Sequence, residues 1–225
     1  MSKFQNLDCC VPVEADNPAI VKNEDLCEKC GHCLAVCQEE IGVQGHYDLL
    51  KNHDTAVCIN CGQCSANCPE GAITLRDECA AVKAAIRDPG KIVVFSTSPS
   101  VRVGVGDAFS DQPGRFVEGK MVSAYVFDVT FAADLTILEE GTELLRRITT
   151  GCAPLPQFTS CCPAWVKYVE TFPPEYIPNI SSAKSPIGMQ GPTVKTYFAA
   201  KKHLDPASIV HVAVTPCTAK KAEIR

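Results

Sequence analysis

The spacing of its cysteines constrains this 225-residue chain more than any other feature. Of its 15 cysteines, eight fall into two runs that share the pattern C-x-x-C-x-x-C-x-x-x-C. The first run contains Cys27, Cys30, Cys33 and Cys37, and the second contains Cys58, Cys61, Cys64 and Cys68. Gly31 and Gly62 occupy the same place in the two runs, 31 residues apart. The region is therefore an internal duplication.

The rest of the composition favours metal binding by these thiols over disulfides. Residues 1–8 lack the apolar core of a secretion signal, which predicts a cytoplasmic chain whose thiols stay reduced. In such a chain a dense set of cysteines holds metal more often than it joins loops. No apolar run approaches the roughly 18 residues that a membrane-spanning helix needs, so no membrane span is predicted. The formal net charge of −5 disfavours a nucleic-acid-binding protein, and 46% hydrophobic residues exclude disorder of the whole chain.

The spacing favours two 4Fe-4S clusters. Three cysteines at C-x-x-C-x-x-C can supply three corners of a cube, and in bacterial two-cluster ferredoxins the fourth cysteine of each run ligates the other cluster. We therefore assign one set of four thiols to each cluster. Cluster one takes Cys27, Cys30, Cys33 and Cys68, and cluster two takes Cys58, Cys61, Cys64 and Cys37. The alternative is a pair of structural zinc sites, but zinc ligands usually come as separated C-x-x-C knuckles.

Such a pair of clusters conducts electrons, and the charge of the region fits that role. Between Glu24 and Glu78 lie ten acidic and only three basic residues. A negative surface steers encounter with a positively charged redox partner, although much of it could equally be solvated charge with no partner. We predict an amino-terminal tail at 1–20 and an α+β ferredoxin-like domain with two 4Fe-4S clusters at 21–88.

Beyond Asp88-Pro89-Gly90 the pattern of apolar and polar residues changes. Short apolar runs at 92–95, 125–127 and 209–214 are typical of buried strands, and helical patterns at 135–148 and 193–202 separate them. This alternation predicts an α/β domain with a largely parallel sheet over residues 89–225. Ligands of such sheets bind at the carboxyl ends of strands. The loop predicted at 96–100 and the segment Thr215-Pro216-Cys217 are therefore candidate sites.

Two further cysteine motifs follow, TSCCPAW at 159–165 and PCTAKKAE at 216–223. Singly, each thiol could be a buried, inert cysteine. Together, behind a two-cluster module, they resemble the first two signature motifs of the iron-only (FeFe) hydrogenases. The resemblance runs from about Leu26 to Arg225 and includes SPSVRVGVGDAF, VFDVTFAADLTILEEGTELLRRI and SSAKSP. It implies that residues 89–225 are an incomplete α/β H-cluster domain of a hydrogenase large subunit.

The resemblance also implies an H-cluster, in which a 4Fe-4S unit is joined to a di-iron unit with CO, cyanide and a bridging dithiolate. Cys162 and Cys217 would ligate the 4Fe-4S unit. Lys220 would donate a hydrogen bond to a cyanide, a sensible match of a cation with an anionic ligand. The residues that would line the other cyanide are Ser98, Pro99 and Ser100.

The proton path is likewise implied by the resemblance. Cys161 would exchange protons with the bridging amine as a general acid and base, and the outward path would use Glu140, Glu143 and Ser181. Glu140 and Glu143 are three residues apart, so they lie on one helix face. Taken without their motif, the two carboxylates would be read as a solvated helix face.

The chain departs from the family pattern in places. Thr215 stands where most members have methionine, and Ile187 stands where most have glutamine. The third motif, with two more H-cluster cysteines, lies beyond the position of Arg225, so Cys162 and Cys217 supply two of four ligands. We therefore expect an amino-terminal fragment that holds an H-cluster only if the missing carboxy-terminal segment is supplied, the alternative being a naturally short protein.

The predicted function is that of an iron–sulfur oxidoreductase, part of a ferredoxin hydrogenase that interconverts protons and electrons with H2 using ferredoxin or a similar carrier. One alternative is an electron-transfer or sensory iron–sulfur protein on a hydrogenase-like scaffold without a complete H-cluster. Another is a hydrogenase-like iron–sulfur assembly or nuclear-factor protein, which has little reason to keep Cys161. No role follows from the sequence for Cys9, Cys10, Cys79 or Cys152.

Overall fold

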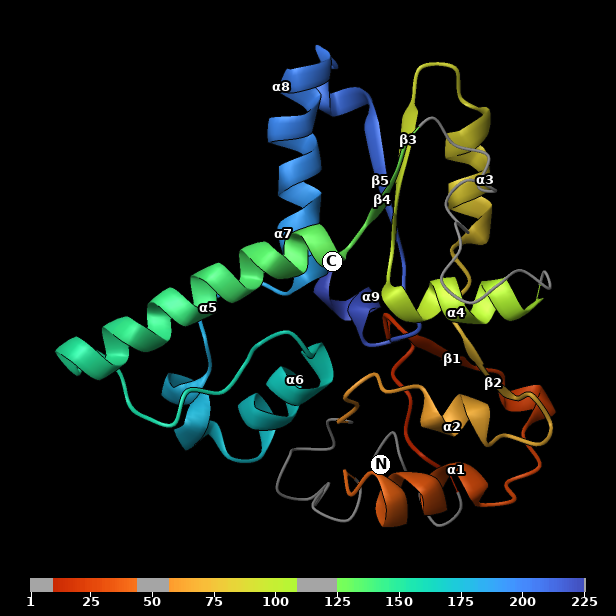
Figure 1. Cartoon of the computed structure of the whole chain (residues 1–225). Helices are drawn as coiled ribbons and strands as arrows, with labels where there is room; N and C mark the ends of the chain where they lie inside the picture. Colours follow the sequence, from red (N-terminus) through yellow and green to blue (C-terminus); the bar gives the residue numbers. More distant parts are fainter. Residues whose placement is uncertain (1–9, 44–56, 109–124, 225) are drawn as a thin grey trace. The chain divides into compact units, whose positions relative to one another are not determined.

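The computed structural model describes residues 10–43, 57–108 and 125–224 (Figure 1). The chain forms two compact units, each assembled from segments that are far apart in the sequence. The first unit combines residues 1–76, 162–177 and 217–225, and the second combines residues 77–161 and 178–216. The contiguous domain ranges expected from the sequence, 1–20, 21–88 and 89–225, stay a prediction. Cys9 lies outside the described residues.

The first unit is built on a short antiparallel pair of strands, β1 (Ile20–Lys22) and β2 (Ile73–Leu75). Two four-residue helices, α1 (His32–Ala35) and α2 (Gln63–Ala66), carry the middle of each cysteine run. A π-helical turn, Val36–Glu40, follows α1 directly. The unit also contains α6 (Pro163–Thr171) and α9 (Lys220–Glu223). Its core is formed largely by small apolar residues and cysteines, among them Cys10, Val11, Ala19, Ile20, Cys33, Cys64 and Ile73.

The internal duplication extends to the backbone conformation. Gly31 and Gly62 both adopt left-handed conformations, with φ of 84° and 76°, and each directly precedes its short helix. Two residues earlier in each run, Lys29 and Asn60 also have positive φ values of 58° and 62°. A non-glycine residue rarely adopts this conformation. Its recurrence at a spacing of 31 residues shows that the two cysteine runs share the same local backbone conformation at this position.

The second unit contains a sheet of three parallel strands in the order β4-β3-β5, which run side by side in Figure 1. These strands are β3 (Ile92–Thr97), β4 (Tyr125–Asp128) and β5 (Ile209–Val214). The helices of the unit are α3 (Cys79–Arg87), α4 (Pro99–Ala108), α5 (Thr130–Thr150), α7 (Pro186–Thr193) and α8 (Ala199–Lys202), with a π-helical turn at Val194–Phe198. The parallel α/β arrangement predicted from the alternation of strands and helices is confirmed. None of the helices in the described residues has the length and apolar character needed to cross a membrane.

Apolar packing between this sheet and the helical turn Val194–Phe198 stabilises the second unit. Val94, Val194 and Ile209 are at most 2% exposed and form one cluster. Phe198 packs edge to face against two rings of β4, with centroid distances of 4.9 Å to Tyr125 and 5.0 Å to Phe127. Such edge-to-face pairs add about 0.5–1.5 kcal/mol beyond the burial of their area.

One local prediction is wrong. The loop predicted at 96–100 is mostly regular structure, because β3 continues through Ser96 and Thr97 and α4 begins at Pro99. Ser96 is 1% exposed, and its Oγ lies 2.7 Å from Nε2 of His211 on the neighbouring strand β5. Burial, together with the charge of Lys195, lowers the pKa of His211 and so favours the neutral ring. A buried hydroxyl is stable in a strand when it finds such a partner, and the serine therefore does not end the strand.

We expect Ile209→Ala to lower the free energy of unfolding by about 2–5 kcal/mol, because it leaves a cavity beside Val94 in the core of the second unit. Ile137→Ala, the same change at a helix position that is 68% exposed, should change it by less than about 0.5 kcal/mol. Urea denaturation followed by circular dichroism measures both. Equal losses in the two variants would contradict the assigned core.

Candidate functional site

Four thiols of the first unit, with a fifth cysteine beside them, line one pocket. They are the thiols assigned to cluster one, Cys27, Cys30, Cys33 and Cys68. Three of them come from the first cysteine run and one from the second. The remaining lining residues are Cys10, Glu28, Gly31, Glu70, Ala72 and Ile73.

A second pocket, with about 350 Å³ of empty space, is lined by the four thiols assigned to cluster two. They are Cys37, Cys58, Cys61 and Cys64. Most of the other lining residues are aliphatic, namely Val11, Ile20, Val36, Ile41, Val43, Val57 and Ile59. The structure thus brings together, in each pocket, three thiols of one run and the last thiol of the other run.

The chemistry of these donor sets fits iron–sulfur clusters. Thiolates are the usual ligands of such clusters, and each pocket offers the four assigned thiols. The pocket of cluster two is lined mostly by aliphatic side chains, and that of cluster one also by Glu28 and Glu70. Burial, together with the charges of the neighbouring cysteines, raises the pKa of Cys64 to about 12. Four thiolates can share such a pocket only when positive metal charge compensates them. No disulfide joins any of the described cysteines. In the same residues no three metal-binding side chains lie close enough together to hold a single metal ion.

The cysteine motif at residues 216–223 is anchored to the second cysteine run within the first unit. Thr218, the residue after Cys217, donates a hydrogen bond of 2.8 Å from its Oγ1 to the backbone oxygen of Asn60. A Cβ atom at Gly62 would lie 2.8 Å from the same Oγ1, so glycine is required there by this contact as well as by its φ. Lys221 donates a further hydrogen bond of 2.5 Å to the backbone oxygen of Arg76.

The residues assigned to the H-cluster belong to both units. Cys162, Cys217 and Lys220 lie in the first unit, where Cys162 is exposed and caps α6 by accepting a hydrogen bond of 3.5 Å from the backbone N–H of Trp165. Lys220 forms an ion pair of 2.7 Å with Glu223 on α9.

Four other assigned residues, Cys161, Ser98, Pro99 and Ser100, lie in the second unit. Cys161 is exposed. The backbone N–H of Ser98 donates 3.0 Å to the oxygen of Val214, so this segment starts at the carboxyl ends of β3 and β5 as predicted.

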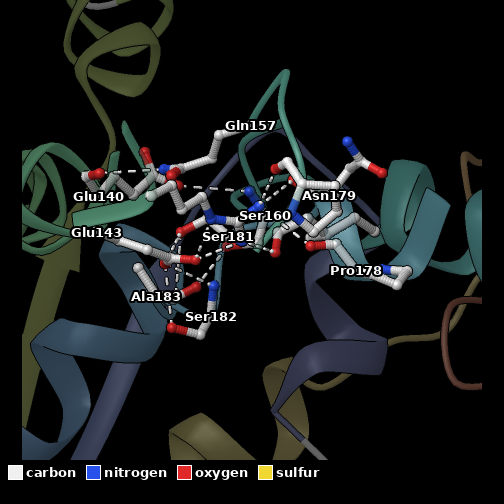
Figure 2. Close-up of polar contacts among 12 residues, drawn as sticks. Glu140, Glu143, Gln157, Ser160, Pro178, Asn179, Ser181, Ser182 and Ala183 are labelled. Carbon is white, nitrogen blue, oxygen red and sulfur yellow. Dashed lines mark hydrogen bonds and ion pairs between the residues drawn. The ribbon is translucent and has the colours of Figure 1, made fainter. Parts of the chain in front are cut away.

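A polar network in the second unit joins Glu140, Glu143 and Ser181 (Figure 2). Glu143 lies on α5, and its Oε2 accepts hydrogen bonds from the Ser181 hydroxyl at 3.0 Å and from the Ser182 backbone N–H at 2.9 Å. One turn earlier, Oε1 of Glu140 accepts from the backbone N–H of Ser160 at 3.4 Å. The hydroxyl of Ser160 donates to the backbone oxygen of Ala183, two residues after Ser181. The network therefore extends from Ser182 to the residue that precedes Cys161.

The centre of this network is Arg147, a residue that the sequence analysis missed. It is 4% exposed and donates to Oε1 of Glu143 at 3.0 Å. It also donates to four backbone oxygens at 2.9–3.4 Å, those of Pro154, Pro178, Asn179 and Ile180. Burial by itself raises the pKa of Glu143, but the hydrogen bonds from Arg147, Ser181 and Ser182 outweigh it and hold the pKa below the usual range. The available signal was the Glu143–Arg147 pair four residues apart on a helix.

Comparisons with known proteins agree with this geometry. Residues 91–225 match a family model described as the C-terminal domain of the iron-only hydrogenase large subunit, and residues 19–69 match one described as a 4Fe-4S dicluster domain. The NADP-reducing hydrogenase subunit HndD of Solidesulfovibrio fructosivorans is 38% identical over 91% of this chain and 39% of its own length. Cytosolic iron-sulfur assembly component 3 of Bos taurus is 35% identical over 74% of this chain and 38% of its own length.

Among solved structures, an apo FeFe hydrogenase from Chlamydomonas reinhardtii superposes with a TM-score of 0.56 at 41% identity. The match covers 63% of this chain and 39% of the algal protein. The chain thus spans about two fifths of the length of these relatives.

We expect Arg147→Met to lower the free energy of unfolding by about 3–5 kcal/mol, because it leaves the Glu143 carboxylate and several buried backbone oxygens without their cation. Arg146→Met, the same change at an exposed neighbouring position on α5, should alter it by less than about 0.5 kcal/mol. Urea denaturation of the two variants beside the unchanged chain tests this. A small effect of Arg147→Met would mean that its hydrogen bonds do not hold the network together.

Proposed function

The chain belongs to the iron-only (FeFe) hydrogenase family, and on this premise we propose that it is an iron–sulfur oxidoreductase, part of a ferredoxin hydrogenase that interconverts two protons and two electrons with H2. The observation that carries this proposal is the polar network of α5. It supplies carboxylates and a hydroxyl, the groups that a proton relay needs, and it reaches the residue next to Cys161.

In this proposal the two pockets of the first unit hold 4Fe-4S clusters that accept electrons from a ferredoxin or a similar carrier. Cys162 and Cys217 hold the 4Fe-4S unit of the H-cluster, and Lys220 donates to one of its anionic ligands. The assignment of Ser98, Pro99 and Ser100 to the other cyanide stays a prediction from the resemblance. When bound, the H-cluster supplies the metal at which protons and electrons combine. The gathering of the four assigned thiols in each pocket supports the electron-carrying part of the proposal.

The protein residues of the second unit move the protons. Cys161 exchanges a proton with Glu140, which the backbone N–H of Ser160 orients. The backbone N–H of Ala183 orients the Ser181 hydroxyl at 3.2 Å, and this hydroxyl donates to Glu143, so it can hand its proton to the carboxylate when its remaining lone pair takes up another from the relay. The hydrogen bonds from Arg147, Ser181 and Ser182 hold the pKa of Glu143 below its usual range, so this carboxylate is charged at rest and keeps a transferred proton only briefly before it passes it on.

The bovine relative named as an iron–sulfur assembly component favours a second candidate function, that of an assembly factor. Both candidates use iron–sulfur clusters, so metal content does not separate them. They differ in the need for a proton relay, because only a hydrogenase has to move protons at each turnover. A carrier-dependent H2 assay therefore distinguishes them.

We expect Glu143→Gln to lower the rate of H2 evolution from a reduced carrier by about 100-fold or more, since an amide cannot relay a proton. The assay uses the polypeptide encoded by the complete open reading frame that contains this chain, with its metal centres loaded. Glu139→Gln, a matched change at an exposed position of α5, should leave the rate unchanged. Absence of H2 evolution by the unchanged protein would favour the assembly-factor candidate, and full activity of Glu143→Gln would refute the relay.

The crossed assignment of cluster ligands makes a second prediction, testable by iron and sulfide analysis. Cys30→Ser alone should remove cluster one, about four iron atoms. Adding Cys68→Ser should remove no more, because Cys68 serves the same cluster, whereas adding Cys37→Ser should remove cluster two as well. If each run held its own cluster, the outcomes of the two double variants would be reversed. Cys79→Ser, at an exposed cysteine outside both pockets, is the control.

A further inference from the structure

A fifth cysteine lies in the pocket assigned to cluster one. Cys10 is 7% exposed, belongs to the core of the first unit and lines the pocket together with Cys27, Cys30, Cys33 and Cys68. Its Sγ lies 3.6 Å from Sγ of Cys27, within hydrogen-bonding distance for two sulfur atoms. The cysteine runs do not contain Cys10, and the ligand assignment leaves it without a role.

The next residue makes an equivalent contact. The backbone N–H of Val11, which is also buried, donates a hydrogen bond of 3.4 Å to Sγ of Cys33. Consecutive residues of one segment are thus directed at two different thiols of the same pocket. Cys10 and Cys27 are 17 residues apart in the sequence, and Val11 and Cys33 are 22 residues apart. The two contacts are therefore not a consequence of local turn geometry.

We propose that the Cys10 thiol and the Val11 amide are hydrogen-bond donors to the ligands of cluster one and raise its reduction potential. The inference rests on the proposed function, since it needs Cys27 and Cys33 to be cluster ligands. A ligand cysteine is a thiolate and has no proton to give. Of the two sulfur atoms 3.6 Å apart, only Cys10 can then be the donor.

The direction of the effect follows from charge. One-electron reduction adds negative charge to a cluster, and part of this charge resides on the ligand sulfurs. Hydrogen bonds to those sulfurs stabilise the reduced form more than the oxidised form, and the potential rises. Two carboxylates, Glu28 and Glu70, line the same pocket and act in the opposite direction, because negative charge disfavours reduction. The two donors would offset this repulsion.

The test is a redox titration of the reconstituted chain with dithionite as the reductant, followed by electron paramagnetic resonance. Cys10→Val keeps an apolar side chain of similar size but removes the donor, and Cys10→Ser keeps a donor. We expect Cys10→Val to reduce the equilibrium constant for reduction of one of the two clusters about threefold to tenfold, where tenfold corresponds to about 59 mV for one electron. Cys10→Ser should lie between this value and that of the unchanged chain. Cys79→Val, at an exposed cysteine, should shift neither cluster.

Each other outcome overturns the proposal in a distinct way. An unchanged pair of midpoint potentials in Cys10→Val, with full iron and sulfide content, would show that Cys10 does not act on the cluster. Loss of about four iron atoms in both Cys10 variants would make Cys10 a ligand rather than a donor. An unchanged chain that takes up no iron and sulfide would overturn the cluster part of the proposed function, and this inference with it.

Discussion

The second unit depends on the burial of one positive charge. Arg147 is 4% exposed, and an uncompensated ion at such a position would cost several kcal/mol. The chain compensates it with the Glu143 carboxylate and with backbone oxygens from two separate segments, 154 and 178–180. Those segments are also joined directly, since Phe158 donates to Asn179 and Ser181 donates to Phe158 through their backbones. The requirements of one guanidinium group thus fix the loop that carries Ser181 and the loop that leads to Cys161.

The first unit buries thiols that are proposed as metal ligands, among them Cys33 and Cys64. Its backbone adopts the unfavourable left-handed conformation at Lys29 and Asn60 so that each run can wrap around a pocket. Hydrogen bonds help to hold the wrapped loops: Asn60 donates from its backbone N–H to Sγ of Cys58 at 3.3 Å, and Thr218 donates to the Asn60 oxygen. In the second unit, then, the charge of Arg147 is buried where backbone oxygens face it, and in the first unit hydrogen bonds of the backbone hold the loops that carry the thiols.

Local patterns predicted much of this structure, and long-range contacts account for what they missed. The strand at 209–214 is observed with the predicted limits, because a short and mostly apolar run is a property of the segment itself. The spacing of the two cysteine runs also led to the crossed ligand assignment, which stays a prediction and which agrees with the two sets of thiols that line the pockets. Ser96 was assigned to a loop because its partner, His211, is 115 residues away. Ser160 was overlooked for the same reason, and Cys10 was left without a role because its contact with Cys27 exists only in the folded chain. Arg147 was overlooked although one of its partners, Glu143, is only four residues away on the same helix.

The division of the chain into units sorts the proposed chemistry into two kinds. Every cysteine proposed as a metal ligand belongs to the first unit, whereas Glu140, Glu143, Ser181 and Cys161 all belong to the second. This separation suits groups with opposite needs. Metal thiolates require an apolar, water-poor pocket, and a proton relay requires hydroxyl and carboxylate groups that can exchange protons with water. The chain passes from the second unit to the first at the peptide bond between Cys161 and Cys162, one of the points where it changes unit. The thiol proposed to carry protons therefore directly precedes the thiol proposed to hold iron. Two adjacent cysteines are therefore the shortest sequence that can provide both a thiol for proton transfer and a thiol for iron ligation.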